Sequence, residues 1–166
     1  ALFAAKPKAA AAISVAALVA GCMAGIAAVF AAEGQPGSQE IAGPWSLPSA
    51  SLTLSLDPLS SFFLLTVLVV CLMAGVYGES YIRRSHELSK SKSIRPLFLI
   101  LTASLAAVVC AKNAILFLFS WEVMALASFF LVIIEDEHAE VRRAGFLYFA
   151  CTHTATLALF VLFSIL

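Results

Sequence analysis

One acidic residue stands in the middle of a long apolar run, and it is the residue of this sequence best placed to do chemistry. The run covers residues 113–134 and contains FLFSWEVMALASFFLV, so Glu122 falls within two residues of its centre. At a rise of 1.5 Å per residue, either end of such a helix is roughly 15 Å away. An ionised acid at this depth costs about 2.5–3.5 kcal/mol on insertion scales, and such acids mark ion pathways or paired charges.

The chemistry that Glu122 suits is proton exchange. The membrane disfavours the charged form and a nearby cation favours it, so an acid between these two influences is a switchable proton site. The alternative is a neutral glutamic acid that hydrogen-bonds a neighbouring helix. A functional role is the default expectation for an acid inside a membrane.

A second polar group lies in the last apolar run, where residues 151–156 read CTHTAT. If the two runs form a helical hairpin, the depths of Glu122 and His153 differ by only roughly 4–5 Å. Thr152, His153 and Thr156 share a helix face through their i+3 and i+4 spacing. Histidine titrates near neutral pH, which makes His153 a candidate proton relay with the threonines as polar lining. Interhelical hydrogen bonding by a neutral histidine explains the same pattern, and both interpretations stay open.

Other kinds of site have no support in the sequence. The four cysteines lie in four different apolar runs, with no metal-ligand or iron–sulfur spacing, and are expected to be packing residues. No phosphate loop, nucleophile elbow or dinucleotide fingerprint is present. We therefore expect no catalytic centre, cofactor or metal in this chain. A net charge of zero gives no indication of nucleic-acid binding.

These side chains must be positioned by membrane helices. The chain has 166 residues, of which 62% are hydrophobic and 12% charged, and its mean hydropathy is +1.01. This composition predicts an all-α polytopic membrane protein with about five transmembrane helices. The expected order is an N-terminal segment 1–8, helix 9–32, loop 33–57, helix 58–79, basic loop 80–95, helix 96–111, helix 113–134 with the central glutamate, loop 135–143 and helix 144–166.

Local signals refine this plan. Asp57 is expected to cap the helix that starts at Pro58. In the preceding loop, residues 33–44 are rich in Gly, Pro and Ser and predict irregular structure, whereas 49–56 alternate as in a strand. Glu79 is expected near water at the end of its helix, and the basic loop is expected to be solvated.

Orientation follows from the basic residues. Nine of the ten lysines and arginines fall on one side of the five-helix plan. The positive-inside rule then places the N-terminus in the cytoplasm and the C-terminus outside. A cleavable signal peptide is a competing interpretation of the first run, which is longer than the 7–15 residues of a signal core. The first residue is Ala1, and the last lies in an apolar run, so we expect a piece of a longer polypeptide.

Three stretches resemble the antiporter-like proton-pumping subunits of complex I. They are LDPLSSFFLL (56–65), NAILFLFSWEVMALASFFLV (113–132) and EVRRAGFLYFACTHTATLALF (140–160). The resemblance looks closest to the relatives in membrane-bound hydrogenases, including the large membrane subunit of formate hydrogenlyase. Its most specific element is the pattern around Trp121, Glu122 and Ser128.

The resemblance implies a fold of about fourteen helices with two inverted five-helix repeats, of which this chain would supply the second to the sixth. Glu122 would be the family's key glutamate on the fifth helix, which pairs with a lysine on a seventh helix beyond this chain. Lys112 stands where relatives often carry an acid, and its effect is open. The partners implied are other membrane-arm subunits, redox subunits of the iron–sulfur, hydrogenase or quinone-reducing kind, and lipid. The implied location is the prokaryotic cytoplasmic membrane.

The expected function is proton translocation within a redox-driven oxidoreductase complex. A non-conducting scaffold that anchors catalytic partners is an alternative from a different class. A subunit of a multisubunit cation/proton antiporter is a third. The sequence leaves open the electron donor and acceptor, and whether protons or sodium ions move.

Overall fold

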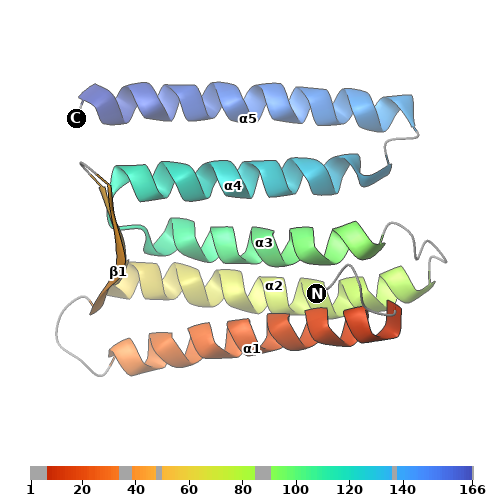
Figure 1. Ribbon diagram of the computed structural model, residues 1–166, viewed down its shortest axis with the longest axis horizontal. Coiled ribbons are helices and arrows are strands. Elements are labelled where there is room, and N and C mark those ends of the chain that lie inside the picture. The colour runs from red at the N-terminus through yellow and green to blue at the C-terminus, as the bar shows by residue number, and fades with distance from the viewer. Residues whose placement is uncertain (1–6, 34–38, 48–49, 85–90, 136–137, 166) are drawn as a thin grey trace.

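The computed structural model describes residues 7–33, 39–47, 50–84, 91–135 and 138–165 of the chain. Its helices run antiparallel to their neighbours in sequence, in the order α1 to α5 (Figure 1). In the described part of the chain, five helices are long and apolar enough to cross a membrane. The prediction of an all-α polytopic membrane protein is therefore confirmed. The helices are α1 (Pro7–Glu33), α2 (Pro58–Arg84), α3 (Ser91–Cys110), α4 (Ala114–Val132) and α5 (Ala139–Ile165), with a 3-10 turn η1 (Ile133–Glu135) after α4.

Several helices reach beyond the ranges expected from apolar residues alone. Both α2 and α3 extend into the segment 80–95 that was expected to be a loop, and only 85–90 of it lie outside the described residues. Helix α5 starts at Ala139 instead of 144, with Glu140 in its first turn, where an acid is favourable. The helices thus continue for some amphipathic turns beyond their apolar runs. Helix ends placed where the apolar residues stop do not include these turns.

The connection between α1 and α2 is a β-hairpin, formed by β1 (Gln39–Leu47) and β2 (Ala50–Leu56). The strand expected over 49–56 is present as β2. The expectation of irregular structure over 33–44 is wrong for residues 39–44, which belong to β1. The pairing shifts register between Ala42 and Ser46, and this irregularity accommodates Gly43 and Pro44.

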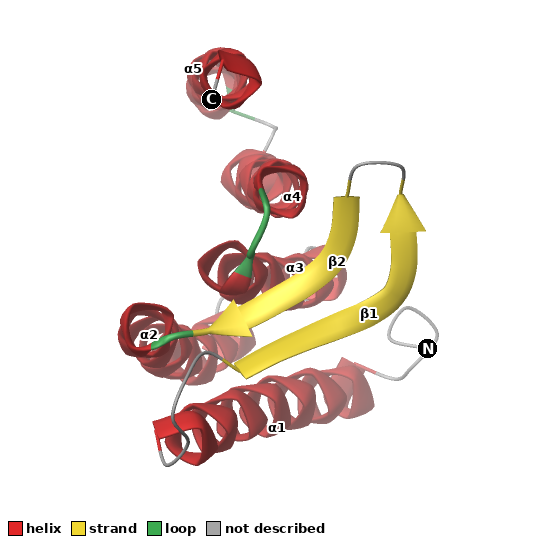
Figure 2. Cartoon of the chain, turned by 90° about the vertical axis from the view of Figure 1, so that its left-hand side faces the viewer, coloured by secondary structure: helices red, strands yellow, loops and turns green. Residues whose placement is uncertain are grey.

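The hairpin crosses one end of the helices (Figure 2). We call this the hairpin end. We call the opposite end the basic end (Figure 1). Helix α2 ends there at Arg84, and the first turns of α5 there contain Arg142 and Arg143. Asp57 caps α2 at the hairpin end as expected, because its carboxylate accepts the backbone N–H of Ser60 at 2.6 Å.

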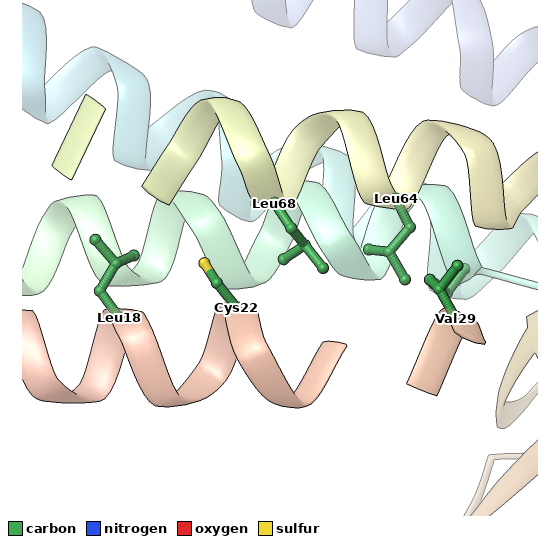
Figure 3. Close-up of a cluster of buried hydrophobic side chains, with 6 residues drawn as sticks. Leu18, Cys22, Val29, Leu64 and Leu68 are labelled. Carbon is green, nitrogen blue, oxygen red and sulfur yellow. The ribbon is translucent and has the colours of Figure 1, made fainter. Parts of the chain in front are cut away.

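The packed core lies between the first three helices (Figure 3). Leu18, Cys22 and Val29 of α1 meet Leu64 and Leu68 of α2. Cys22, Cys71 and Cys110 are buried packing residues, as expected, whereas Cys151 is exposed on α5. Beyond this core, α4 packs on α3, and α5 packs on α4 at the edge of the molecule.

Candidate functional site: an acid–imidazole pair between α4 and α5

The start of α4 is fixed by contacts at the hairpin end. Asn113 caps the helix, with its side-chain oxygen accepting the N–H of Leu116 at 2.8 Å. The backbone N–H of Lys112 donates to the carbonyl of Thr53 in β2 at 3.2 Å, and its ammonium pairs with the Glu40 carboxylate of β1. The hairpin thus holds the turn from which the glutamate-bearing helix begins.

Glu122 and His153 lie side by side in the middle of their helices. Val123 is the middle residue of α4 and Thr152 the middle residue of α5, so each group is next to a helix centre. The Nε2 atom of His153 is 3.5 Å from Oε2 of Glu122. Their side chains are 34% and 28% exposed. The structure therefore brings together the two residues that the sequence singled out.

A backbone contact sets the tautomer of His153. Its Nδ1 lies 3.0 Å from the carbonyl oxygen of Phe149, one turn earlier on α5. Because a carbonyl oxygen only accepts, this hydrogen bond requires the hydrogen to be on Nδ1. The other nitrogen, Nε2, faces the carboxylate and is the atom that can gain or lose a proton. The ring of Phe149 packs on the imidazole, with the centroids 3.9 Å apart.

Aromatic contacts on both sides of the pair join α4 to α5. Phe117 meets Phe163 toward the hairpin end, with centroids 5.9 Å apart, and Phe129 meets Phe149 toward the basic end, at 5.1 Å. Near the basic end, a Cβ on Gly145 would collide with the Ile133 side chain. Glycine at this position therefore permits the close approach of α5 to the end of α4.

The two threonines of the site donate within their own helix. The Thr152 hydroxyl donates to the Tyr148 carbonyl at 2.9 Å, and the Thr156 hydroxyl to the Thr152 carbonyl at 3.1 Å. Thr156 is buried, with 2% of its surface exposed. Their hydroxyl hydrogens are thus engaged within α5 in this state.

The pair opens onto an apolar surface. Glu122 is three residues after Phe119 and four before Leu126, so the three share one face of α4. Phe119 is 61% exposed and Leu126 37%, and the same stripe continues through Ile115 and Phe130. The carboxylate therefore lies at the border between the α4–α5 contact and a face that meets the membrane or another membrane element.

A second charged pair was not anticipated from the sequence. The Arg95 guanidinium of α3 binds the Glu79 carboxylate of α2 through two hydrogen bonds, from Nε to Oε2 at 2.9 Å and from Nη2 to Oε1 at 3.0 Å. Their side chains are only 5% and 9% exposed. The expectation that Glu79 is near water and that Arg95 is solvated is therefore wrong, because both side chains are buried against each other. The available signal was an acid near the end of one helix and a base near the start of the next, which antiparallel packing brings together.

The described residues provide no cluster of three or more His, Cys, Asp or Glu side chains placed to hold a metal ion. The chemistry that the described arrangement supports is the exchange of a proton between a carboxylate and an imidazole.

Comparisons with known proteins find relatives that include named components of redox enzymes. The chain is 34% identical over 117 residues to an uncharacterized protein of Mycobacterium tuberculosis, covering 70% of this chain and 18% of the relative. It is 31% identical over 115 residues to hydrogenase-4 component B of Escherichia coli, covering 69% and 17%. It is 28% identical over 95 residues to NADH-ubiquinone oxidoreductase chain 5 of Paramecium tetraurelia, covering 57% and 16%. No protein-family model matches the chain.

The chain spans less than a fifth of the length of these curated relatives. Its five apolar helices and these similarities identify it as an integral membrane protein, related over part of its length to named components of a hydrogenase and of NADH-ubiquinone oxidoreductase.

Proposed function

We propose that the chain belongs to a proton-translocating membrane subunit of a redox-driven complex, of the NADH:quinone oxidoreductase or membrane-bound hydrogenase kind. Within the latter, we propose the formate hydrogenlyase type, which its motifs resemble. The observation that carries this proposal is the contact of Glu122 with His153 in the middle of two membrane helices. The relatives named as components of redox enzymes support the class of complex.

The pair handles a proton by sharing it. With Nδ1 committed to the Phe149 carbonyl, a proton on Nε2 makes an imidazolium beside a carboxylate. Transfer of that proton to Oε2 leaves a neutral imidazole and a neutral acid, with no change in total charge. A cation that approaches Glu122 favours the ionised acid and moves the proton to His153, and its withdrawal reverses the transfer. The lysine implied by the family resemblance is the cation proposed for this role.

The basic end lies in the cytoplasm of a prokaryotic cell and the hairpin end outside, in agreement with the positive-inside rule. Thr152 and Thr156 line the route once their hydroxyls rotate. Redox subunits of the complex supply the driving reaction, and this chain contributes none of its cofactors.

The direct test replaces Glu122 by glutamine in the full-length protein within its complex. Proton uptake into inverted membrane vesicles, followed by quenching of a pH-sensitive dye, is expected to fall to background while the complex still assembles. Glu140→Gln is the matched control, because it makes the same chemical change at an exposed site outside the apolar part of α5. Translocation at the wild-type rate in Glu122→Gln would refute the proposal and favour a scaffold.

The role of His153 needs its own test. A relay predicts that His153→Gln, which retains hydrogen bonding but cannot accept and release a proton, slows translocation and flattens its pH dependence. If the variant kept both the rate and the pH profile, the histidine would only be a packing residue against Phe149.

A further inference from the structure

A lateral groove runs between α1 and α3, with α2 as its floor. Two cavities form it, of about 160 Å³ and about 280 Å³, and both are lined by Leu18 and Leu99. The first reaches Arg95 toward the basic end, and the second reaches Ala106. At 1.5 Å per residue, the groove therefore follows α3 for roughly 16 Å. We call it the α1–α3 groove.

Small residues keep the groove open. Gly21 lines the larger cavity and Gly78 the smaller one. A Cβ added at either glycine would meet no atom within 4 Å. By contrast, a Cβ on Gly75 would collide with Leu18, so α1 and α2 are close-packed at this point of the smaller cavity's wall.

The dimensions of the groove select its occupant. A helix is roughly 10–12 Å across with its side chains, far too wide for cavities of about 160 and 280 Å³ spread over this length. A single hydrocarbon chain is long and thin enough to enter. In a membrane, lipid tails surround the helices and fill such surfaces.

Charged groups lie at one end of this apolar channel. Glu79 and Arg95 line the smaller cavity together with Ser14. Their two charges balance, and both side chains are at least nine-tenths buried. A headgroup that carries both a phosphate and an ammonium group complements such a pair, because the phosphate can approach the guanidinium and the ammonium the carboxylate. A purely anionic headgroup offers no cationic group to the Glu79 carboxylate.

We propose that the α1–α3 groove is a phospholipid site. One acyl chain lies along the groove, and a phosphatidylethanolamine headgroup sits at the Glu79–Arg95 pair. This inference does not depend on proton translocation, since it concerns helices that do not contribute Glu122 or His153.

The test measures lipid retained by the purified full-length protein, by native mass spectrometry after exchange into phosphatidylethanolamine or phosphatidylglycerol. The variant Gly21→Leu/Gly78→Leu fills the groove, and we expect retained phosphatidylethanolamine to fall at least about tenfold, because buried methylenes each contribute about a fourfold factor. Ala16→Leu is the matched control. It adds the same side chain at an exposed position of α1, two residues from Leu18 and outside both cavities, and it should retain lipid like the wild type.

Glu79→Gln/Arg95→Gln tests the headgroup separately. It removes both charges while keeping hydrogen-bonding side chains, so the preference for phosphatidylethanolamine should disappear while the acyl chain is still held. Unchanged lipid retention in the groove-filling variant would overturn the proposal. A wild-type preference for phosphatidylglycerol would do the same, as would cross-linking from Gly21→Cys to another helix of the protein, which would show that protein fills the groove.

Discussion

Two charged pairs in this protein differ in geometry and burial. One is Glu79–Arg95 between α2 and α3, and the other is Glu122–His153 between α4 and α5. The first is bidentate, with hydrogen bonds of 2.9 and 3.0 Å, and almost completely buried. The second is a single contact of 3.5 Å between side chains about one third exposed. Arginine does not release its proton in proteins, whereas histidine does so near neutral pH. The comparison separates a buried, bidentate charge pair that holds helices together from the looser pair to which we assign proton exchange.

The surroundings of the two pairs also differ in how tightly they are packed. The first pair adjoins the leucine-rich core of α1, α2 and α3. The second lies beside an exposed apolar stripe, in the contact of α4 with an outer helix that buries little besides Gly145 and Thr156. A site that must exchange protons with other groups needs such an open side, and a structural pair does not.

The largest effect is expected from Arg95→Ala. It leaves the Glu79 carboxylate buried without its partner, and the free energy of unfolding should fall by about 3–5 kcal/mol. Thermal unfolding of the purified protein measures this. Glu79→Gln/Arg95→Gln should recover most of the loss because no charge remains unpaired, and a loss below about 1 kcal/mol in Arg95→Ala would contradict a structural role.

A smaller effect is expected at the contact that brings α5 onto α4. Gly145→Leu forces a side chain into Ile133 and should cost about 1–3 kcal/mol. Removal of the obstacle in Gly145→Leu/Ile133→Ala should restore part of the stability, which a double-mutant cycle of unfolding measurements detects. Equal costs with and without Ile133→Ala would show that the close approach is not the cause.

Glu122→Gln should change stability little, despite its expected effect on translocation. A pair at 3.5 Å whose side chains are about one third exposed contributes at most about 1 kcal/mol. Unfolding of Glu122→Gln beside Glu79→Gln makes the comparison directly, and the first variant should be clearly the more stable. A loss in Glu122→Gln as large as in Glu79→Gln would remove the distinction between the two pairs.

The smallest effect is expected at the cap of α2. The backbone N–H of Ser60 and its hydroxyl hold the pKa of the Asp57 carboxyl below its usual value. A lowered folded-state pKa contributes stability above the unfolded value of about 3.9, and this contribution is lost as the pH falls through the folded value. Asp57→Ala should therefore unfold earlier than the wild type at pH 6, and the gap should narrow below pH 4. A gap independent of pH would mean that the charge has no part in capping.

The sequence predicted the features that depend on local or one-dimensional signals. Apolar runs identified the membrane helices, and Asp57 before Pro58 identified a cap that the structure contains. The similar depths of Glu122 and His153 along their apolar runs predicted that the two residues are neighbours. The helix ends were missed because amphipathic turns resemble loops in composition. Strand β1 was missed because a segment that contains Gly and Pro resembles a loop as well.

The Glu79–Arg95 pair, unlike the Glu122–His153 pair, was not predicted from the sequence. Each residue alone fits an ordinary position at the edge of a membrane helix, and its burial arises only when α1 packs across α2 and α3. Burial that depends on a third element is tertiary information, which periodicity and hydropathy do not contain.

The order in which the helices pack has a consequence for biosynthesis. Each helix lies against the one made just before it, from α1 and α2 to α4 and α5. If the helices enter the membrane in chain order, Glu79 of α2 is in place before Arg95, which lies near the start of α3 at the same end of the helices. With insertion in chain order, Arg95 would enter the bilayer beside the carboxylate that balances its charge, which lowers the cost of placing an arginine among lipids.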